Sequence, residues 1–259
     1  MNPSDQQHAA LMEAFDVFLV LLPDATVRIG DGYRVVTVPS FPIPLVNAVI
    51  SEGTNEEATI RDLAAAIAEV EAAGMPPVVT GRDGVDAHVL EEARRLGLMG
   101  EERIPGMSVS RDAFRPSEAP NVELRRVGAD PELLDVAMDV TARGFGAPRA
   151  LFEPLFASGM QAEGLDLWLA FVSDVAVSTA TGLVRGDHVG IFDVATPPEH
   201  RRKGYGANVT SAAVAAGFGA GATTAYLQSS EMGFPVYEAL GFRTVATYVV
   251  QTWPSAENP

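Results

Sequence analysis

The sequence contains no cysteine and only four histidines among its 259 residues. Without cysteine the chain has no disulfide, no thiolate nucleophile and no zinc site that uses sulfur. The histidines, at positions 8, 88, 188 and 200, do not have the spacing of a metal-binding pair on one helix face. The sequence therefore predicts that no metal is bound.

Long hydrophobic runs are also missing. The longest run, VFLVLLP at residues 17–23, follows a stretch that contains acidic residues. It is far shorter than the roughly 20 apolar residues that cross a bilayer. We therefore predict neither a signal peptide nor a membrane span and, because cysteine is absent, a cytoplasmic protein.

Positive charge is scarce in this chain. The formal net charge is −16, and Lys203 is the only lysine. A surface of this sign repels polyanions, so neither nucleic acid nor an anionic membrane is a predicted partner. An anionic ligand would need a local group of cations, and the stretch RRKGYGA at residues 201–207 supplies one.

The organisation of the chain is that of a globular α/β protein. Hydrophobic residues make up 47% of it, and a polar stretch with two prolines, residues 112–121, predicts a linker between domains 1–115 and 120–259. Antiparallel strands are expected across residues 165–196, followed by the basic loop, a helix and a strand that starts near residue 223. A helix between two strands of one sheet implies that these strands run parallel.

The basic loop connects the end of a predicted strand to the start of a predicted helix. Glycine allows the backbone to approach a ligand closely, and the first N–H groups of a helix have no partner within it, so such loops bind phosphate. The P-loop pattern GxxxxGK[ST] is absent, and Gly204-Tyr205-Gly206 is not completed by a third glycine because Val209 follows. A nucleotide enzyme of either standard fold is therefore disfavoured.

The segment resembles the coenzyme A loop of the GNAT superfamily of N-acetyltransferases. The family pattern is Arg/Gln-x-x-Gly-x-Gly/Ala, and Arg201, Gly204 and Gly206 occupy its three positions. Residues 191–206 resemble the family's fourth strand, whose end splays, and residues 229–242 resemble its last conserved segment. The resemblance covers residues 120–259 and implies the mixed α/β acyl-CoA N-acyltransferase fold, with acetyl-CoA as acyl donor.

The resemblance also implies roles for individual residues. The backbone around Val194–Thr196 would align the pantetheine arm, and the amides of Arg201–Ala207 would hold the pyrophosphate. Tyr237 would be the general acid that protonates the departing thiolate, with packing in the core as its alternative role. Ser230, where many relatives have asparagine, would be a further contact. The implied coenzyme A residues are Val194, Ala195, Thr196, Arg201, Arg202, Lys203, Gly204, Tyr205, Gly206, Ala207 and Ser230.

The base that deprotonates the attacking amine is not fixed by the pattern. The carboxylate that some relatives carry on this strand would fall near Gly190. Asp193, His188, Glu199 and His200 are the nearby titratable residues, and strand alternation places Asp193 on the side opposite His188. We take Asp193 as the catalytic candidate, with local capping or pairing as the alternative.

The N-terminal half contains a weak internal repeat of the same plan. The LGL of residues 96–98 matches the LGF of residues 240–242 at an offset of 144, with a strand, a helix and a further strand around each. At that offset Gly204 falls on Ile60, and the acidic pair Glu56-Glu57 replaces the basic loop. We therefore predict two tandem copies of the fold, the first degenerate and without a coenzyme A loop. An unrelated α/β domain is the alternative.

The predicted function is acetyl-CoA-dependent N-acetylation of a primary amine in a small molecule or a protein. The acidic composition favours a cationic acceptor. The alternative is a non-catalytic coenzyme A-binding or regulatory module of the same fold. The residues do not determine the acceptor, the pathway or the oligomeric state, a homodimer included.

Overall fold

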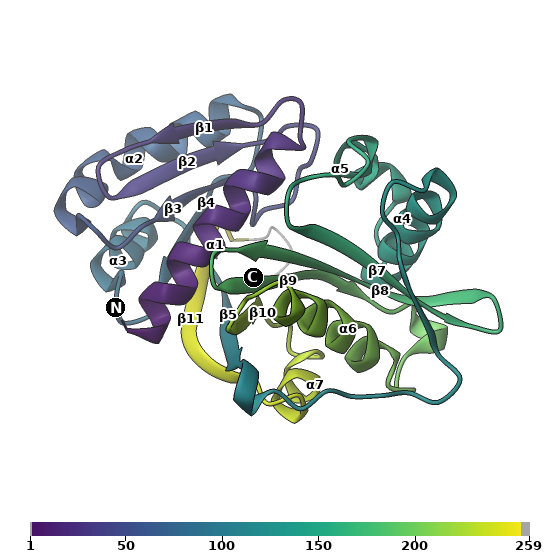
Figure 1. Ribbon diagram of the computed structural model, residues 1–259. Coiled ribbons are helices and arrows are strands. Elements are labelled where there is room, and N and C mark those ends of the chain that lie inside the picture. The colour runs from purple at the N-terminus through teal and green to yellow at the C-terminus, as the bar shows by residue number, and fades with distance from the viewer. Residues whose placement is uncertain (1, 255–259) are drawn as a thin grey trace. The chain divides into compact units, whose positions relative to one another are not determined.

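The computed structural model describes residues 2–254, which form two compact units (Figure 1). Within this range, unit 1 contains residues 2–21 and 106–245, and unit 2 contains residues 22–105 and 246–254. Each unit is thus assembled from two segments that are far apart in the sequence. The domain boundaries 1–115 and 120–259, which were predicted from the linker at residues 112–121, remain predictions.

Unit 1 contains a mixed sheet with helices packed on it. Its elements are α1 (Pro3–Val20), β5 (Gly100–Ser110, from residue 106 onward), η1 (Arg111–Ala113), β6 (Glu123–Arg126), α4 (Pro131–Phe145), η2 (Arg149–Leu151), α5 (Glu153–Ala157), β7 (Leu165–Val172), β8 (Val175–Arg185), β9 (His188–Ala195), η3 (Pro198–His200), α6 (Tyr205–Gly219), β10 (Thr224–Gln228), α7 (Phe234–Ala239) and the first residues of β11 (Arg243–Thr252). The strand order is β5-β10-β9-β8-β7-β6. β9 and β10 run parallel, as the crossover helix predicted.

Capping residues in the sequence determine where helix α4 begins and ends. The Asp130 side chain accepts hydrogen bonds from the first-turn amides of Glu132 and Leu133, and Pro131 opens the helix. Gly146 ends it in the left-handed conformation, with φ of 66°. These local signals place the C-terminal turn of α4, and with it Gly144, against the end of β9.

Helices α6 and α1 pack on opposite faces of the sheet. Gly217 of α6 lies so close to Val189 of β9 that an added Cβ would be 2.5 Å from the valine Cβ. On the other face, the Tyr226 hydroxyl donates a hydrogen bond to the Ala10 carbonyl of α1, 2.8 Å away. The strand and the helix on either side of the basic loop are therefore held by close packing.

The strands of unit 2 also differ in direction. Its elements are β1 (Thr26–Ile29), β2 (Tyr33–Thr37), β3 (Ala48–Ser51), α2 (Glu56–Ala72), β4 (Val78–Arg82), α3 (Ala87–Arg95), the first part of β5 and the greater part of β11. The strand order is β1-β2-β3-β4-β11, in which β3 and β4 run parallel and each of the other neighbouring pairs runs antiparallel. The core of this unit lies between its sheet and helices α2 and α3.

The same order of elements occurs twice along the chain. β3, α2, β4, α3 and β5 follow one another as β9, α6, β10, α7 and β11 do, and the first two strands of each set are parallel. The constant offset of 144 is wrong at the loop, where the capping residues Asn55 and Gly204 are 149 residues apart. Four residues join β3 to α2, whereas nine join β9 to α6. Gly204 therefore corresponds to Asn55 and not to Ile60.

A membrane-spanning helix and a group of metal ligands are both absent from the residues that the structure describes. Within residues 2–254, none of the helices has the length and apolar character needed to cross a membrane. In the same range, no three histidine, aspartate or glutamate side chains are grouped closely enough to hold a metal ion.

Candidate functional site

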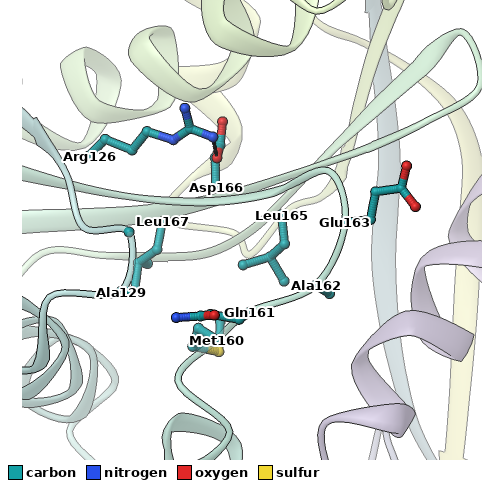
Figure 2. Close-up of a pocket in the computed structure, with 10 residues that line it drawn as sticks. Arg126, Ala129, Met160, Gln161, Ala162, Glu163, Leu165, Asp166 and Leu167 are labelled. Atoms are coloured by element: carbon teal, nitrogen blue, oxygen red, sulfur yellow. Dashed lines mark hydrogen bonds and ion pairs between the residues drawn. The ribbon is translucent and has the colours of Figure 1, made fainter.

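A cavity of about 510 Å³ lies at the start of β7 in unit 1. Figure 2 shows the ion pair between Arg126 and Asp166 above Leu165, with Gln161 and Met160 below. Leu165 pairs with Leu183 of β8, and Leu183 pairs with Gly190 of β9. The cavity therefore lies beside the first residues of β9, far from its end. None of the predicted site residues lines this cavity, so it is separate from the basic loop.

The basic loop is next to a gap between two parallel strands. The ladder of β9 and β10 ends at the pair Gly190 and Tyr226. β9 nevertheless continues to Ala195 and β10 to Gln228. Beyond the last pair, the facing backbone edges no longer have each other as hydrogen-bond partners. This divergence is the splayed strand end that the family resemblance implied.

A β-bulge lies at the end of β9. The register with β8 changes from Thr181 opposite Phe192 to Thr179 opposite Ala195, which leaves one extra residue on β9. Asp193 at this place has φ of 50°, in the left-handed region where such bulges usually have glycine. Strained residues of this kind are concentrated at functional sites.

The bulge also ends the alternation of side chains along β9. The ring of Phe192 packs edge-on against Phe18 of α1, with centroids 5.0 Å apart. Val194 packs against the core cluster on the α6 face. Two residues that regular alternation would place on one face are thus on opposite faces. The alternation that placed Asp193 opposite His188 does not extend past Phe192.

Asp193 is half-buried, and no cation in residues 2–254 forms an ion pair with it. Removal of its carboxylate from water raises its pKa to about 6, because burial disfavours the charged form. A carboxyl group with this pKa changes its charge just below neutral pH. It is therefore suited to accept a proton there.

The other candidates for the base, His188, Glu199 and His200, each lie close to an oppositely charged or titratable side chain. The Nδ1 of His188 is 2.7 Å from the carboxylate of Asp187. The Glu199 carboxylate pairs with Arg143 of α4, and His200 lies 4.0 Å from the same carboxylate. At Gly190, an added Cβ would lie 2.5 Å from the Phe192 ring, so a carboxylate side chain has no room there. Asp193 is the remaining carboxylate on β9.

The start of α6 is open to an anion. Gly204 is its N-cap, with φ of 82° and no side chain to satisfy the first amides. The first hydrogen bond within α6 is donated by the Asn208 amide to the Gly204 carbonyl, 3.0 Å away. The amides of Tyr205, Gly206 and Ala207 precede that bond and have no acceptor within the helix. These donors and the helix dipole together favour a negative group.

The three cations of the loop differ in what they contact. The Arg201 guanidinium donates to the carbonyls of Thr196 and Gly144, at 3.0 and 2.8 Å. The Lys203 ammonium donates to the Glu199 carbonyl at 3.2 Å. Arg202 is exposed, and no hydrogen bond or ion pair joins its side chain to any other residue that the structure describes. Of the three cations, Arg202 therefore has the side chain that is most available to bind a ligand.

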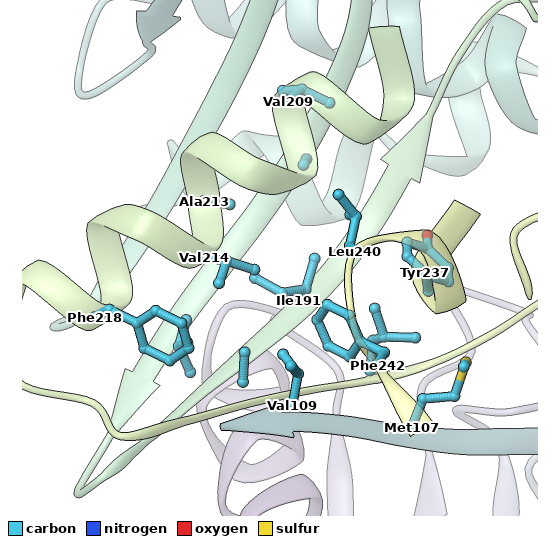
Figure 3. Packing of buried hydrophobic residues seen from close by; sticks show 14 of the residues in the cluster. Met107, Val109, Ile191, Val209, Ala213, Val214, Phe218, Tyr237, Leu240 and Phe242 are labelled. Atoms are coloured by element: carbon cyan, nitrogen blue, oxygen red, sulfur yellow. The ribbon is translucent and has the colours of Figure 1, made fainter. Parts of the chain in front are cut away.

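Tyr237 lies in α7 and is only 8% exposed. Its ring packs edge-on against Phe242, 6.0 Å between centroids, within the core cluster that Figure 3 shows. Burial raises its pKa to about 12, so the phenol remains protonated at neutral pH. Nearby, the exposed Ser230 accepts a hydrogen bond from the Gly233 amide at 3.2 Å. The core packing of Tyr237 holds the ring in place and is compatible with a catalytic hydroxyl.

The corresponding place in unit 2 is filled by the protein's own groups. Asn55 caps α2 by accepting the Ala58 amide, and Glu56 adds a negative charge in the first turn. The Asp86 carboxylate accepts hydrogen bonds from the Arg82 amide and the Ser51 hydroxyl, both at 2.7 Å. Negative charge at this helix start repels an anion. The Ala58 amide, which could bind one, is already bound to the Asn55 side chain.

Replacement of Gly144 by alanine should lower the free energy of unfolding by about 1–3 kcal/mol, the usual cost of overpacking. An added Cβ would lie 2.7 Å from the Ala195 Cβ and 2.9 Å from the Thr196 amide nitrogen. The measurement is urea unfolding followed by circular dichroism. Gly219→Ala is the matched control, because a Cβ there has open space within 4 Å. Equal stability of the two variants would contradict this prediction.

Comparison with known proteins bears on the same part of the chain. The model of the acetyltransferase (GNAT) family matches residues 132–242. None of the curated protein sequences compared with the chain matches it.

The solved structures that are similar to the chain include two GCN5-related N-acetyltransferases and a tandem GNAT protein. A GCN5-related N-acetyltransferase from Kribbella flavida is 18% identical, with a TM-score of 0.75 over 99% of this chain and 97% of that chain. One from Sphaerobacter thermophilus is 12% identical, with a TM-score of 0.64 over 86% and 81%. A tandem GNAT protein from the clavulanic acid biosynthesis pathway is 15% identical, with a TM-score of 0.61 over 94% and 89%. At these identities the likeness shows the fold.

The family match and the fold agree with the geometry around the basic loop. The predicted mixed α/β fold is confirmed, and so is its likeness to tandem proteins. Residues 132–242 thus match the acetyltransferase (GNAT) family model, and over most of its length the chain has the fold of a tandem GNAT protein.

Proposed function

We propose that this protein is an acetyl-CoA-dependent N-acetyltransferase whose active site lies in residues 120–259. One observation carries the proposal: the uncapped start of α6 lies next to the splayed and bulged end of β9. In the proposal, residues 1–115 are a degenerate copy of the fold that supports the active half. The match of residues 132–242 to the acetyltransferase (GNAT) family model supports acetyl-CoA as the donor.

The loop is proposed to bind the pyrophosphate of coenzyme A. The free amides at the start of α6 donate to it, and Arg202 adds charge from the side of the solvent. The edge of β9 at Val194–Thr196 has lost its neighbour β10, so its backbone can pair with the amide groups of the pantetheine arm. Ser230 lies across the gap, just after β10, and would be a further contact.

Asp193 and Tyr237 are proposed to move the two protons of the reaction. Asp193 accepts a proton from the ammonium of the acceptor, directly or through water, since only the neutral amine can attack the thioester. The new C–N bond forms as the C–S bond breaks. Tyr237 donates its phenolic proton to the departing thiolate, which leaves as the thiol of coenzyme A. The nitrogen loses its second proton to water as the amide forms, and proton exchange with water restores the Tyr237 phenol.

The acceptor is proposed to be a cationic primary amine of a small molecule or a protein. The chain has a net charge of −16, so its field attracts such an amine. A cytoplasmic location remains a prediction from the sequence.

The test is consumption of acetyl-CoA in the presence of polyamines, amino acids, aminoglycosides and peptide N-termini. Thiol release with one class of amine is the expected result, together with calorimetric binding of coenzyme A. Binding of coenzyme A without turnover on any amine would favour the non-catalytic module. Tighter binding of ATP or NAD than of acetyl-CoA would refute the proposal.

A further inference from the structure

We propose that Arg201 is a positioning residue, whose side chain fixes the end of β9 and does not itself bind the anion. The inference rests on the proposed function, because it concerns the same coenzyme A site. It separates the two neighbouring arginines of the loop: Arg201 holds the backbone that binds the ligand, and Arg202 supplies the charge.

The contacts of the Arg201 guanidinium bridge two elements that are distant in sequence. Its Nε donates to the Thr196 carbonyl just after β9, and its Nη2 donates to the Gly144 carbonyl in α4, 57 residues away. The first acceptor, the Thr196 carbonyl, belongs to the strand end that is proposed to align the pantetheine arm. The planar fork of arginine can make both bonds at once, whereas a lysine ammonium is a single point on a flexible chain. This bridge holds the strand end against α4.

A pair of hydroxyl groups holds the same strand end from the side of β8. Ser178 is fully buried, and its Oγ donates to the Ala195 carbonyl at 2.9 Å. The Thr196 Oγ1 is 2.8 Å from the Ser178 Oγ. Since the single Ser178 proton goes to Ala195, Thr196 is the donor in the second bond. Ala195 and Thr196, two of the three residues proposed to align the pantetheine arm, are therefore each held by a hydrogen bond to Ser178.

The fixed strand end also determines where α6 begins. An added Cβ at Gly206 would be 3.3 Å from the Thr196 Oγ1, so the first turn of α6 lies directly beside Thr196. A shift of Thr196 would displace the free amides of the loop relative to the strand edge. Arg201 therefore sets the distance between the two backbone segments that hold the ligand, although its own charge is turned toward protein carbonyls.

The experiment compares Arg201→Lys with Arg202→Lys, two variants that both keep the positive charge. Coenzyme A binding is measured by calorimetry at several salt concentrations, and folding is checked by thermal unfolding. We expect Arg201→Lys to weaken binding about tenfold or more, from the loss of a charge-assisted hydrogen bond, with an unchanged salt slope. Arg202→Lys should weaken binding less than Arg201→Lys does, because the proposed role of Arg202 depends on its charge. Arg202→Gln should bind more weakly and have a smaller salt slope, because a phosphate contact is lost.

The outcomes separate the inference from the proposed function. Absence of coenzyme A binding by the wild-type protein would refute the proposed function itself. If the wild type binds, two results would overturn the positioning role. The first is wild-type affinity of Arg201→Lys. The second is a salt slope of Arg201→Gln that is reduced as much as the salt slope of Arg202→Gln. If Arg201→Lys does not fold, Ser178→Ala decides, since it removes the hydroxyl that fixes Ala195. A several-fold weaker affinity with intact folding supports the inference, and wild-type affinity overturns it.

Discussion

Tyr237→Phe is expected to lower kcat by about a hundredfold or more while the Kd for coenzyme A changes by less than about twofold. The substitution removes only the hydroxyl, and the ring can keep its packing against Phe242. The raised pKa, about 12, keeps the Tyr237 phenol protonated and able to donate at neutral pH. Loss of this proton donor slows departure of the thiolate but leaves the binding groups in place. Steady-state kinetics and calorimetry measure the two effects separately.

Tyr248→Phe is the matched control for this prediction. Tyr248 is another buried tyrosine whose pKa is raised by burial, and it belongs to β11 in unit 2. It should keep wild-type kcat. Unchanged turnover of Tyr237→Phe would assign Tyr237 to the core alone. A fall in turnover distinguishes an enzyme from a binding module, which has no turnover to lose.

The sequence predicted those parts of the fold that depend on local signals. Pro131 after Asp130 begins α4, and Gly146 ends it, because capping and left-handed conformations are properties of single residues. The basic loop between β9 and α6 was recognisable because its spacing matches a family pattern. The parallel direction of β9 and β10 followed from the crossover helix that connects them.

Long-range partners could not be predicted in the same way. No local signal shows that α1 packs on β9, or that β11 pairs with β4 at a separation of more than 160 residues. The assembly of each unit from distant segments follows from such pairings. The bulge could not be predicted either, because its residue with positive φ is Asp193 and not a glycine, which would have indicated such a conformation. These features depend on tertiary packing, which overrides local preference.

The roles of the three cations were also beyond the sequence. RRK predicts a single group of positive charge, but the structure turns Arg201 toward two carbonyl groups and leaves Arg202 in solvent. The signal that could have separated them is the family pattern itself, in which the first position is restricted and the second is variable. A side chain needed for geometry would be restricted in type, whereas one that supplies charge could be replaced by another cation.

Asp193→Asn is expected to lower kcat by about a hundredfold or more and to remove the acid limb of the pH profile. In the wild type, turnover should fall as the pH decreases through about 6, because protonation of Asp193 abolishes the base. Asparagine also tolerates the left-handed conformation, so the variant changes the charge and keeps the φ of the bulge. Glu199→Gln is the matched control, since that carboxylate pairs with Arg143 in the neighbouring loop and should leave the acid limb in place.

The same substitution should stabilise the fold above pH 6, the opposite of its effect on turnover. The folded-state pKa of about 6 exceeds the usual value of 3.8, so the folded protein binds the Asp193 proton more tightly than the unfolded chain does. The protonated form is therefore stabilising below about pH 4, and this contribution is lost as the pH rises through 6. An asparagine side chain is neutral at every pH, so Asp193→Asn should gain about 1–3 kcal/mol in the free energy of unfolding at pH 8 and nothing near pH 4. Urea unfolding at the two pH values measures the difference, and an equal effect at both would show that the carboxylate is not desolvated. A gain in stability together with a loss of turnover would mean that the protein keeps a strained, desolvated charge at the end of β9 for its chemistry.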